Sequence, residues 1–261
     1  MTACAAIIIA RLALILAQEA YESCYHRRVR QTLAQCTQIE LVGDRVRAHF
    51  DSDLIPAPGQ FLLARLIPAF DPYLRRPLFP TQIADSGFAV VFSPTDPALN
   101  TLAPGAKIDL IGPVGAATPD FPFRTRVLLV ADPDPSALLP FAARVVAQGG
   151  TATLLLSTHY PLDALDPEIE LRIGDLPTLA AEFAPSADLV FICAGRALHR
   201  PIHRRLTEAR SFVSREYARA LVTCPMPCGT GACGACAVKT IHGWKMACVD
   251  GPFFSLTELD T

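Results

Sequence analysis

Four cysteines near the carboxyl end constrain this chain most strongly. Cys228, Cys233 and Cys236 form a C-x4-C-x2-C segment, and Cys248 follows after eleven further residues. This is the spacing with which thiolates hold a [2Fe–2S] cluster. The sequence therefore predicts a protein that moves electrons.

The residues between these cysteines favour a loop that wraps closely around an inorganic core. Glycine accepts positive φ and leaves N–H groups free to point at sulfur, and the loop contains Gly229, Gly231 and Gly234. Residues 237–241 and 244–248 have the pattern of two strands joined by a His242-Gly243 turn. Such a hairpin would bring Cys248 back to the other three cysteines.

Other uses of cysteine are weaker alternatives. A structural zinc also takes four thiolates, but its ligands usually come as two C-x2-C pairs. A disulfide framework is disfavoured because the chain has nine cysteines, an odd number. Cys224 could replace a ligand, although the spacing is complete without it, and we interpret it as a bystander thiol. The scattered cysteines are interpreted as small buried hydrophobes; they are Cys4, Cys24, Cys36 and Cys193.

Length and composition leave room for more than a cluster domain. The chain has 261 residues, of which 51% are hydrophobic, enough for two domains or one large one. A net charge of −2 gives no electrostatic footprint for nucleic acid. Free thiols predict a reducing compartment, the cytoplasm. The apolar run 5–17 is too short to span a bilayer and predicts a buried or interfacial helix, with a membrane contact as the weaker alternative.

The hydrophobic pattern changes along the chain. Between residues 37 and 114, short strands at regular spacing predict a small antiparallel barrel; they are 38–42, 45–50, 61–66, 88–92 and 107–111. Strand 126–130, helix 136–148 and strands 149–157 and 187–194 then predict a parallel sheet with covering helices. We therefore expect an α+β multi-domain protein with an N-terminal helical extension (1–34), an antiparallel β-barrel (35–120), an α/β parallel-sheet domain (121–220) and a cluster domain (221–261).

This order of domains, together with several separated motifs, resembles a known family. The motifs are Pro58-Gly59-Gln60-Phe61, Leu74-Arg75-Arg76-Pro77, Ile111-Gly112-Pro113-Val114-Gly115, the cluster loop from Cys228 to Cys236, and Cys248-Val249-Asp250-Gly251-Pro252-Phe253-Phe254. From about Gln35 to its end, the chain resembles the electron transfer subunit of the class B dihydroorotate dehydrogenases, in the ferredoxin reductase-like superfamily.

The resemblance implies a short series of electron carriers in pyrimidine biosynthesis. An FMN-containing dihydroorotate dehydrogenase catalytic subunit would oxidise dihydroorotate, and a hetero-oligomer would pass electrons through the [2Fe–2S] cluster and FAD to NAD+. This chain would be the electron transfer component, without catalytic residues of its own. Its cluster ligands would be Cys228, Cys233, Cys236 and Cys248. Its FAD site would lie on the barrel, with Arg76 on the pyrophosphate; the other expected FAD residues are Pro77, Leu78, Phe79, Thr95 and Asp96.

The chain also departs from the family pattern. Phe79 stands where a serine hydroxyl is expected beside the flavin, and Thr95-Asp96 replaces a Gly-Thr pair at the phosphates. The loop expected to receive a dinucleotide reads Ala131-Asp132-Pro133-Asp134-Pro135-Ser136, where carboxylates repel phosphate and prolines cannot donate. Its structural interpretation is a helix cap supplied by Asp134 or Ser136. We therefore expect weak FAD binding and no NAD(H) binding. The alternative function is a divergent iron–sulfur relay or docking protein that keeps the reductase fold as a scaffold.

Two further groups of residues invite interpretation. His199 and His203 lie one helical turn apart among arginines, and the sequence favours a solvated face over a metal pair. Apolar residues near Cys248 predict either a surface for the partner or part of the core; they are Trp244, Met246, Phe253 and Phe254.

Overall fold

The computed structural model describes residues 29–66, 74–118, 120–161, 163, 165–210 and 213–259. The apolar run 5–17 and the thiols of Cys4 and Cys24 lie outside the described residues. No helix among the described residues is long and apolar enough to cross a membrane.

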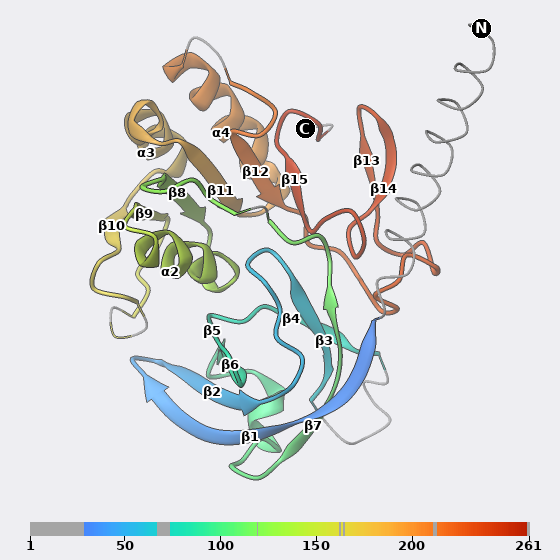
Figure 1. Ribbon diagram of the computed structural model, residues 1–261. Helices are drawn as coiled ribbons and strands as arrows, with labels where there is room; N and C mark the ends of the chain where they lie inside the picture. The colour runs from blue at the N-terminus through green and yellow to red at the C-terminus, as the bar shows by residue number, and fades with distance from the viewer. Residues whose placement is uncertain are drawn as a thin grey trace, which may run out of the picture.

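A seven-stranded antiparallel sheet forms the first part of the chain, and it curls through the lower part of Figure 1. Its strands pair in the order β4-β3-β7-β1-β2-β6-β5. Alternating apolar residues of these strands, among them Phe50, Leu62 and Leu110, point into one buried cluster. The strands are β1 (Arg30–Val42), β2 (Arg45–Asp51), β3 (Phe61–Arg65), β4 (Arg76–Leu78), β5 (Gln82–Ala84), β6 (Gly87–Phe92) and β7 (Lys107–Val114).

A six-stranded sheet follows, in the order β10-β9-β8-β11-β12-β15. Strands β8 (Arg126–Ala131), β9 (Thr151–Leu156), β10 (Glu170–Ile173), β11 (Leu189–Cys193) and β12 (Ala218–Leu221) pair in parallel. Helix α2 (Leu139–Ala147) covers one face, and α3 (Leu176–Phe183) and α4 (Arg196–Ala209) cover the other. Because both faces are covered, β8 is apolar on both sides: Leu128 belongs to one core cluster and Leu129 to the other.

The last three strands form a separate hairpin and one further strand of the six-stranded sheet. Strands β13 (Ala237–Thr240) and β14 (Gly243–Met246) form a hairpin of their own, at the right of Figure 1. Strand β15 (Phe253–Ser255) then pairs antiparallel with β12 and becomes the last strand of the six-stranded sheet.

The expected succession of an antiparallel sheet, a parallel sheet and a C-terminal module is confirmed. Details differ. Strand β1 begins at Arg30, earlier than the apolar pattern indicates, because its first residues, Arg30 to Gln35, pair with β7. The three-residue strands β4 and β5 were not predicted, since neither has room for an alternating pattern. The expected helix 136–148 starts with a 3-10 turn, η2 (Ser136–Leu138), before α2.

Candidate functional site

The four cysteines of the C-x4-C-x2-C…C segment form two pairs of thiols. Cys228, Cys233 and Cys236 lie on the loop between β12 and β13, and Cys248 follows β14. Cys228 and Cys233 hydrogen-bond through their side chains. The Sγ atoms of Cys236 and Cys248 are 3.2 Å apart. The β13–β14 hairpin thus returns Cys248 to the loop, as the sequence predicted.

Glycine backbone shapes this loop. Gly229, Gly231 and Gly234 have φ of 70°, 78° and 67°, values that other residues rarely adopt. The N–H of Gly231 donates to Cys248 Sγ at 3.1 Å. A Cβ on Gly229 would lie 2.9 Å from a methyl of Leu63, so the loop also packs directly on β3. The chain turns its N–H groups inward toward sulfur here and has no room for larger side chains at Gly229.

The two pairs differ in their electrostatics. Burial raises the pKa of Cys228, but hydrogen bonds from the backbone of Thr230 and Cys233 stabilise its thiolate and bring the pKa to about 6. Burial, and then the neighbouring sulfur of Cys236, raise the pKa of Cys248 far above its ordinary value. A thiol must lose its proton to bind metal, so loading this site would release protons.

The sulfurs lie just beneath the surface. Cys236 and Cys248 are buried, Cys228 is half-buried and Cys233 is exposed. The residues around Cys233, from Ala232 to Ala235, are exposed as well. Solvent and a partner therefore reach the pair Cys228 and Cys233 more easily than the pair Cys236 and Cys248.

The thiols come together as pairs and not as one closed group. Among the described residues, no three His, Cys, Asp or Glu side chains, these cysteines included, form a group that could hold a single metal ion. Two pairs of thiols match a cluster in which each iron takes two protein ligands, and they match a single tetrahedral zinc less well. Cys224 is half-buried, and burial followed by the charge of Cys236 raises its pKa.

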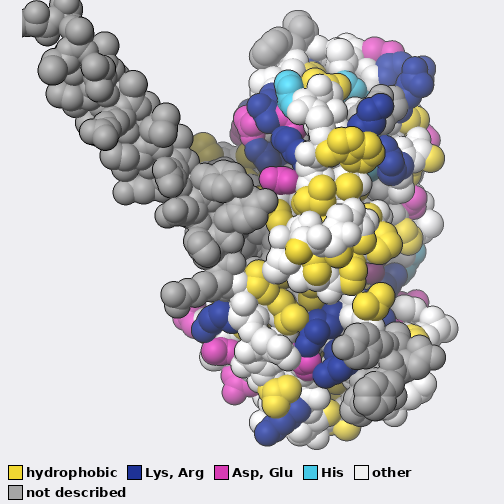
Figure 2. Space-filling view, turned by 90° about the vertical axis from the view of Figure 1, so that its right-hand side faces the viewer, with side chains coloured by type: hydrophobic (Ala, Val, Ile, Leu, Met, Phe, Trp, Pro, Cys, Tyr) yellow, Lys and Arg dark blue, Asp and Glu magenta, His cyan; other side chains and the backbone are white. Residues whose placement is uncertain are grey.

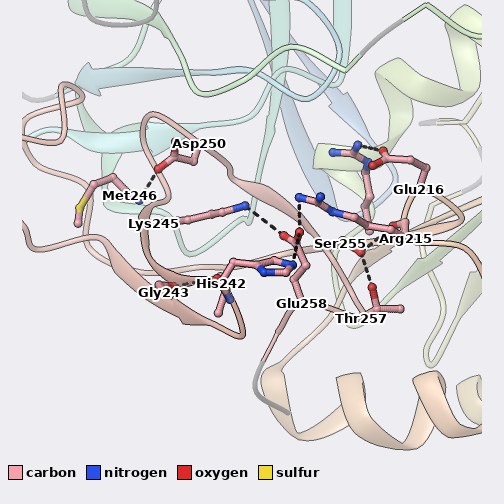
Figure 3. A network of polar contacts seen from close by, with 12 residues as sticks. Arg215, Glu216, His242, Gly243, Lys245, Met246, Asp250, Ser255, Thr257 and Glu258 are labelled. Carbon is pink, nitrogen blue, oxygen red and sulfur yellow. Dashed lines mark hydrogen bonds and ion pairs between the residues drawn. The ribbon is translucent and has the colours of Figure 1, made fainter. Parts of the chain in front are cut away.

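A buried carboxylate fixes the hairpin that carries the chain to Cys248. The side chain of Glu258 is 4% exposed and faces Arg215, Lys245 and His242 (Figure 3). Lys245 Nζ lies 3.1 Å from Glu258 Oε2, and His242 Nε2 lies 3.7 Å from Oε1. Sequence reasoning missed this group. Its only signal is one acid within the apolar run from Phe253 to Leu259.

The predicted partner surface near Cys248 is only partly at the surface. Trp244 is 69% exposed and Met246 is half-buried, but Phe253 and Phe254 are buried in the two cores beside the six-stranded sheet. Phe253 and Phe254 are therefore core residues and not partner surface, because β15, which carries them, pairs with β12. Ile241 and Val249 are exposed instead. Figure 2 shows the side of the molecule on which β13 and β14 lie in Figure 1, with hydrophobic side chains gathered over its middle.

The structure brings two of the predicted FAD residues together. Arg76 Nη2 lies 3.0 Å from Asp96 Oδ1 and 2.8 Å from Oδ2. Asp96 also accepts a hydrogen bond from the N–H of Ala98 and caps the short 3-10 helix η1 (Pro97–Asn100). The expected phosphate-binding arginine is thus paired with a carboxylate from the same predicted site.

The other predicted FAD residues have structural partners too. Pro77 lies in β4, and Leu78 is buried in the core of the antiparallel sheet. The ring of Phe79 packs on Phe61 with centroids 5.3 Å apart. Thr95 Oγ1 is 3.1 Å from Ser93 Oγ, at the surface.

Carboxylates also line the loop after β8, which the sequence analysis considered as a dinucleotide-binding loop. Asp132 accepts from the hydroxyl of Ser157. Asp134 accepts from the N–H and hydroxyl of Ser136 at 2.8 and 2.6 Å and so holds the turn before α2. The expected helix cap from Asp134 or Ser136 is not formed, because the N-cap residues of η2 and α2 are Pro135 and Leu138 and neither makes a side-chain cap bond. Arg45 Nη1, from the start of β2, lies 3.3 Å from Asp134 Oδ2 and joins the two sheets.

The prediction of a solvated histidine pair was wrong for His199. This side chain is 1% exposed, and its Nε2 lies 3.0 Å from the carbonyl of Ala194. Burial lowers its pKa, as it does for half-buried His203. The apolar face of α4, with Ile202 and Leu206, turns His199 inward.

Comparison with known proteins matches this geometry to a family. Residues 225–260, which contain all four cysteines of the two pairs, match the model of the iron–sulfur cluster binding domain of dihydroorotate dehydrogenase B. The predicted resemblance is confirmed. The electron transfer subunit of dihydroorotate dehydrogenase B from Shouchella clausii is 24% identical over 263 residues, covering 89% of this chain and 99% of that protein. The corresponding Bacillus cereus subunit is 24% identical over 230 residues, covering 77% of this chain and 86% of that protein.

Solved structures show the fold of this chain. The NADH-dependent reduced ferredoxin-NADP oxidoreductase, described for flavin-based electron bifurcation, superposes with a TM-score of 0.68. It is 19% identical, and the match covers 88% of this chain and 90% of that chain. The chain thus has a ferredoxin reductase-like fold, and its carboxyl end carries the segment that matches the iron–sulfur cluster binding domain, as the sequence predicted.

Proposed function

We propose that this chain is an electron transfer subunit that holds a [2Fe–2S] cluster on Cys228, Cys233, Cys236 and Cys248. One observation carries the proposal: four thiols occur as two pairs around a loop whose backbone N–H groups, those of Gly231, Thr230 and Cys233, donate to sulfur. When bound, the cluster supplies one-electron oxidation and reduction. Cys228 is ready to bind as a thiolate, and the N–H of Gly231 would stabilise charge on Cys248.

The proposed partner is an FMN-containing dihydroorotate dehydrogenase catalytic subunit, bound as a hetero-oligomer in pyrimidine biosynthesis. The names of the relatives support this assignment. So does the exposure of the Cys233 side of the loop, because electrons can enter or leave only where another redox group approaches. Free thiols and a cluster suit a reducing compartment, and we propose the cytoplasm.

FAD is the proposed second cofactor, on the antiparallel sheet beside Arg76. The observation that tests its fit is a buried polar atom: Arg76 Nε has no hydrogen-bond partner among the described residues. An anion such as the FAD diphosphate could accept from it. Of the remaining predicted FAD residues, Pro77 and Leu78 lie on β4, Phe79 follows it, and Thr95 and Asp96 lie on the segment that precedes η1.

A second function is favoured by the acidic groups at both expected nucleotide sites. Asp96 is paired with Arg76, and Asp134 is paired with Arg45. The alternative is therefore a divergent iron–sulfur relay or docking protein that keeps the reductase fold and has lost either NAD binding alone or both NAD and FAD binding. The absorption spectrum of the purified protein separates the two functions, because a bound flavin and a bare cluster absorb differently.

The cluster assignment is tested by replacing single cysteines. Cys233→Ser and Cys236→Ser should each abolish the visible absorbance of the anaerobically reconstituted protein, because an alcohol is a poor substitute for thiolate on iron. The matched control is Cys224→Ser, which should keep the absorbance. Iron and labile sulfide are counted in parallel. A protein that takes up one zinc and never two irons with two sulfides would contradict the proposal.

A further inference from the structure

We propose that Asp96 is an internal anion that competes with the FAD diphosphate for Arg76. The proposal rests on the proposed FAD site, and it concerns how this chain sets its affinity there. In the structure, both oxygens of Asp96 lie on the same nitrogen of Arg76, Nη2, at 3.0 and 2.8 Å. The carboxylate thus occupies one corner of the guanidinium only.

The rest of the guanidinium is available for a second anion. Arg76 Nε is buried and has no hydrogen-bond partner among the described residues. A structural ion pair of the strongest kind would use two parallel N–H donors, one to each oxygen. Here the pair leaves a buried donor unmatched, which costs free energy until an acceptor arrives. The arrangement suits an arginine that can exchange its partner.

Because the Arg76 side chain is half-buried, it needs a nearby negative charge when no ligand is bound. The guanidinium carbon of Arg76 lies 5.7 Å from the centre of the Phe92 ring, and the side chain is 41% exposed. A half-buried cation without a counter-charge is unfavourable, and Asp96, whose side chain is 15% exposed, supplies that charge. Without ligand, Asp96 therefore stabilises the site. With ligand, the same carboxylate repels the phosphates.

The position of Asp96 does not depend on Arg76. Its Oδ1 accepts from the N–H of Ala98 at 2.9 Å, and Pro97 starts the 3-10 turn that it caps. The backbone therefore holds the carboxylate in place when Arg76 turns to another anion. An asparagine would keep this cap, since Asn and Asp serve it equally well. Asp96→Asn thus removes the charge and keeps the local structure.

FAD titration of the protein, followed by quenching of flavin fluorescence and by calorimetry, tests the proposal. Asp96→Asn should lower the Kd for FAD at least about tenfold, the ratio that corresponds to about 1.4 kcal/mol. Arg76→Gln should weaken binding, and Asp96→Asn should give no gain in the Arg76→Gln background, as a double-mutant cycle requires for coupled residues. ADP, which has the diphosphate and no flavin ring, should show the same gain with Asp96→Asn.

The control variant is Asp53→Asn, which removes one charge next to the same sheet, from the exposed pair with Arg30. It should leave the Kd for FAD unchanged. The proposal is overturned if Asp96→Asn binds FAD no more tightly than the wild type, if the gain persists without Arg76, or if neither protein binds FAD. Visible cluster absorbance is recorded for every variant. Because neither Asp96 nor Arg76 is among the proposed cluster ligands, a failure at Asp96 is distinguishable from a failure of the proposed cluster.

Discussion

Cys193 shows how strongly the carboxyl edge of the parallel sheet perturbs a single side chain. It ends β11, and burial, followed by the nearby charge of Asp134, raises the pKa of its thiol to about 12. The unfolded chain would titrate this thiol near 9. Between these values the unfolded state loses the proton and the folded state keeps it, so folding stability must fall as pH rises.

We therefore expect Cys193→Ala to reduce the alkaline loss of stability. A single proton contributes a slope of at most about 1.4 kcal/mol per pH unit between pH 9 and pH 12. Urea unfolding of the wild type and the variant at pH 8, 9 and 10 measures this slope. The free energy of unfolding should drop less steeply in the variant above pH 9. Parallel curves for the two proteins would show that Cys193 ionises normally.

Individual residues were predictable from sequence where their chemistry is local. The two pairs of cysteines could be singled out because their spacing lies within 21 residues of chain and glycines mark the loop. The pair of Arg76 with Asp96 joins residues 20 apart, and Arg215 meets Glu258 across 43, so no local pattern shows either. His199 was assigned to the surface because its arginine neighbours dominate the pattern, whereas its own position falls on the apolar face of α4.

Among the elements, the β13–β14 hairpin depends on one carboxylate. Glu258 binds His242 at the turn, Lys245 on β14 and Arg215 before β12 (Figure 3). The N–H of Ile241 also donates to the carbonyl of Glu258 at 2.9 Å. The hairpin is thereby fastened to the segment that follows β15, and it positions Cys248.

Glu258→Gln should therefore destabilise the protein and its cluster together. Loss of the charge leaves Arg215 and Lys245 without their shared counter-charge, and we expect the free energy of unfolding to fall by about 1.5–3 kcal/mol, the range for a hydrogen bond to a charged group. Tm should fall by roughly 2–4 °C for each kcal/mol. Bleaching of the cluster by an iron chelator should become faster. Glu216→Gln, at a 63% exposed carboxylate paired with Arg219, is the control; equal effects of the two changes would contradict the role of Glu258.

The same hairpin presents Trp244, which we expect to contact the catalytic subunit. Trp244→Ala should raise the Kd for an FMN-containing dihydroorotate dehydrogenase at least about tenfold, since large exposed aromatics dominate binding energy when an interface buries them. Surface plasmon resonance with the purified partner measures it. Leu41→Ala, at an 81% exposed residue of β1, should change nothing. Indistinguishable affinities for the two variants would place the interface elsewhere.

Strands could be predicted from the sequence where apolar residues alternate. They could not be predicted where a strand forms only because it pairs with a segment far away in the sequence. Strands β2, β3 and β6 were found nearly to the residue. The start of β1 is polar, and it is a strand only because β7 lies alongside. Phe253 and Phe254 were weighed as partner surface or core, and the pairing of β15 with β12, invisible in the sequence, decides for the core.

In the whole molecule, the two sheets are joined where a dinucleotide would enter. Arg45 crosses from β2 to Asp134, and the β1–β2 turn at Gly43 touches Pro161. We expect no NADH binding in calorimetry up to about millimolar concentration, because Asp132 and Asp134 repel phosphates and Pro133 and Pro135 cannot donate to them. Micromolar binding with rapid reduction of the cluster or flavin would refute this and restore electron flow to NAD+.

The integration of β15 into the six-stranded sheet determines how electrons can travel. The N–H of Gly115, after β7, donates to the carbonyl of Cys248, and β12 holds β15. The thiols are therefore hydrogen-bonded into the same frame as both sheets. A swinging-arm shuttle, in which a tethered carrier visits donor and acceptor in turn, would have to break these contacts. For the proposed electron transfer we therefore expect a fixed entry point, so turnover should depend on how long a partner stays bound and how closely its redox group approaches the Cys233 side.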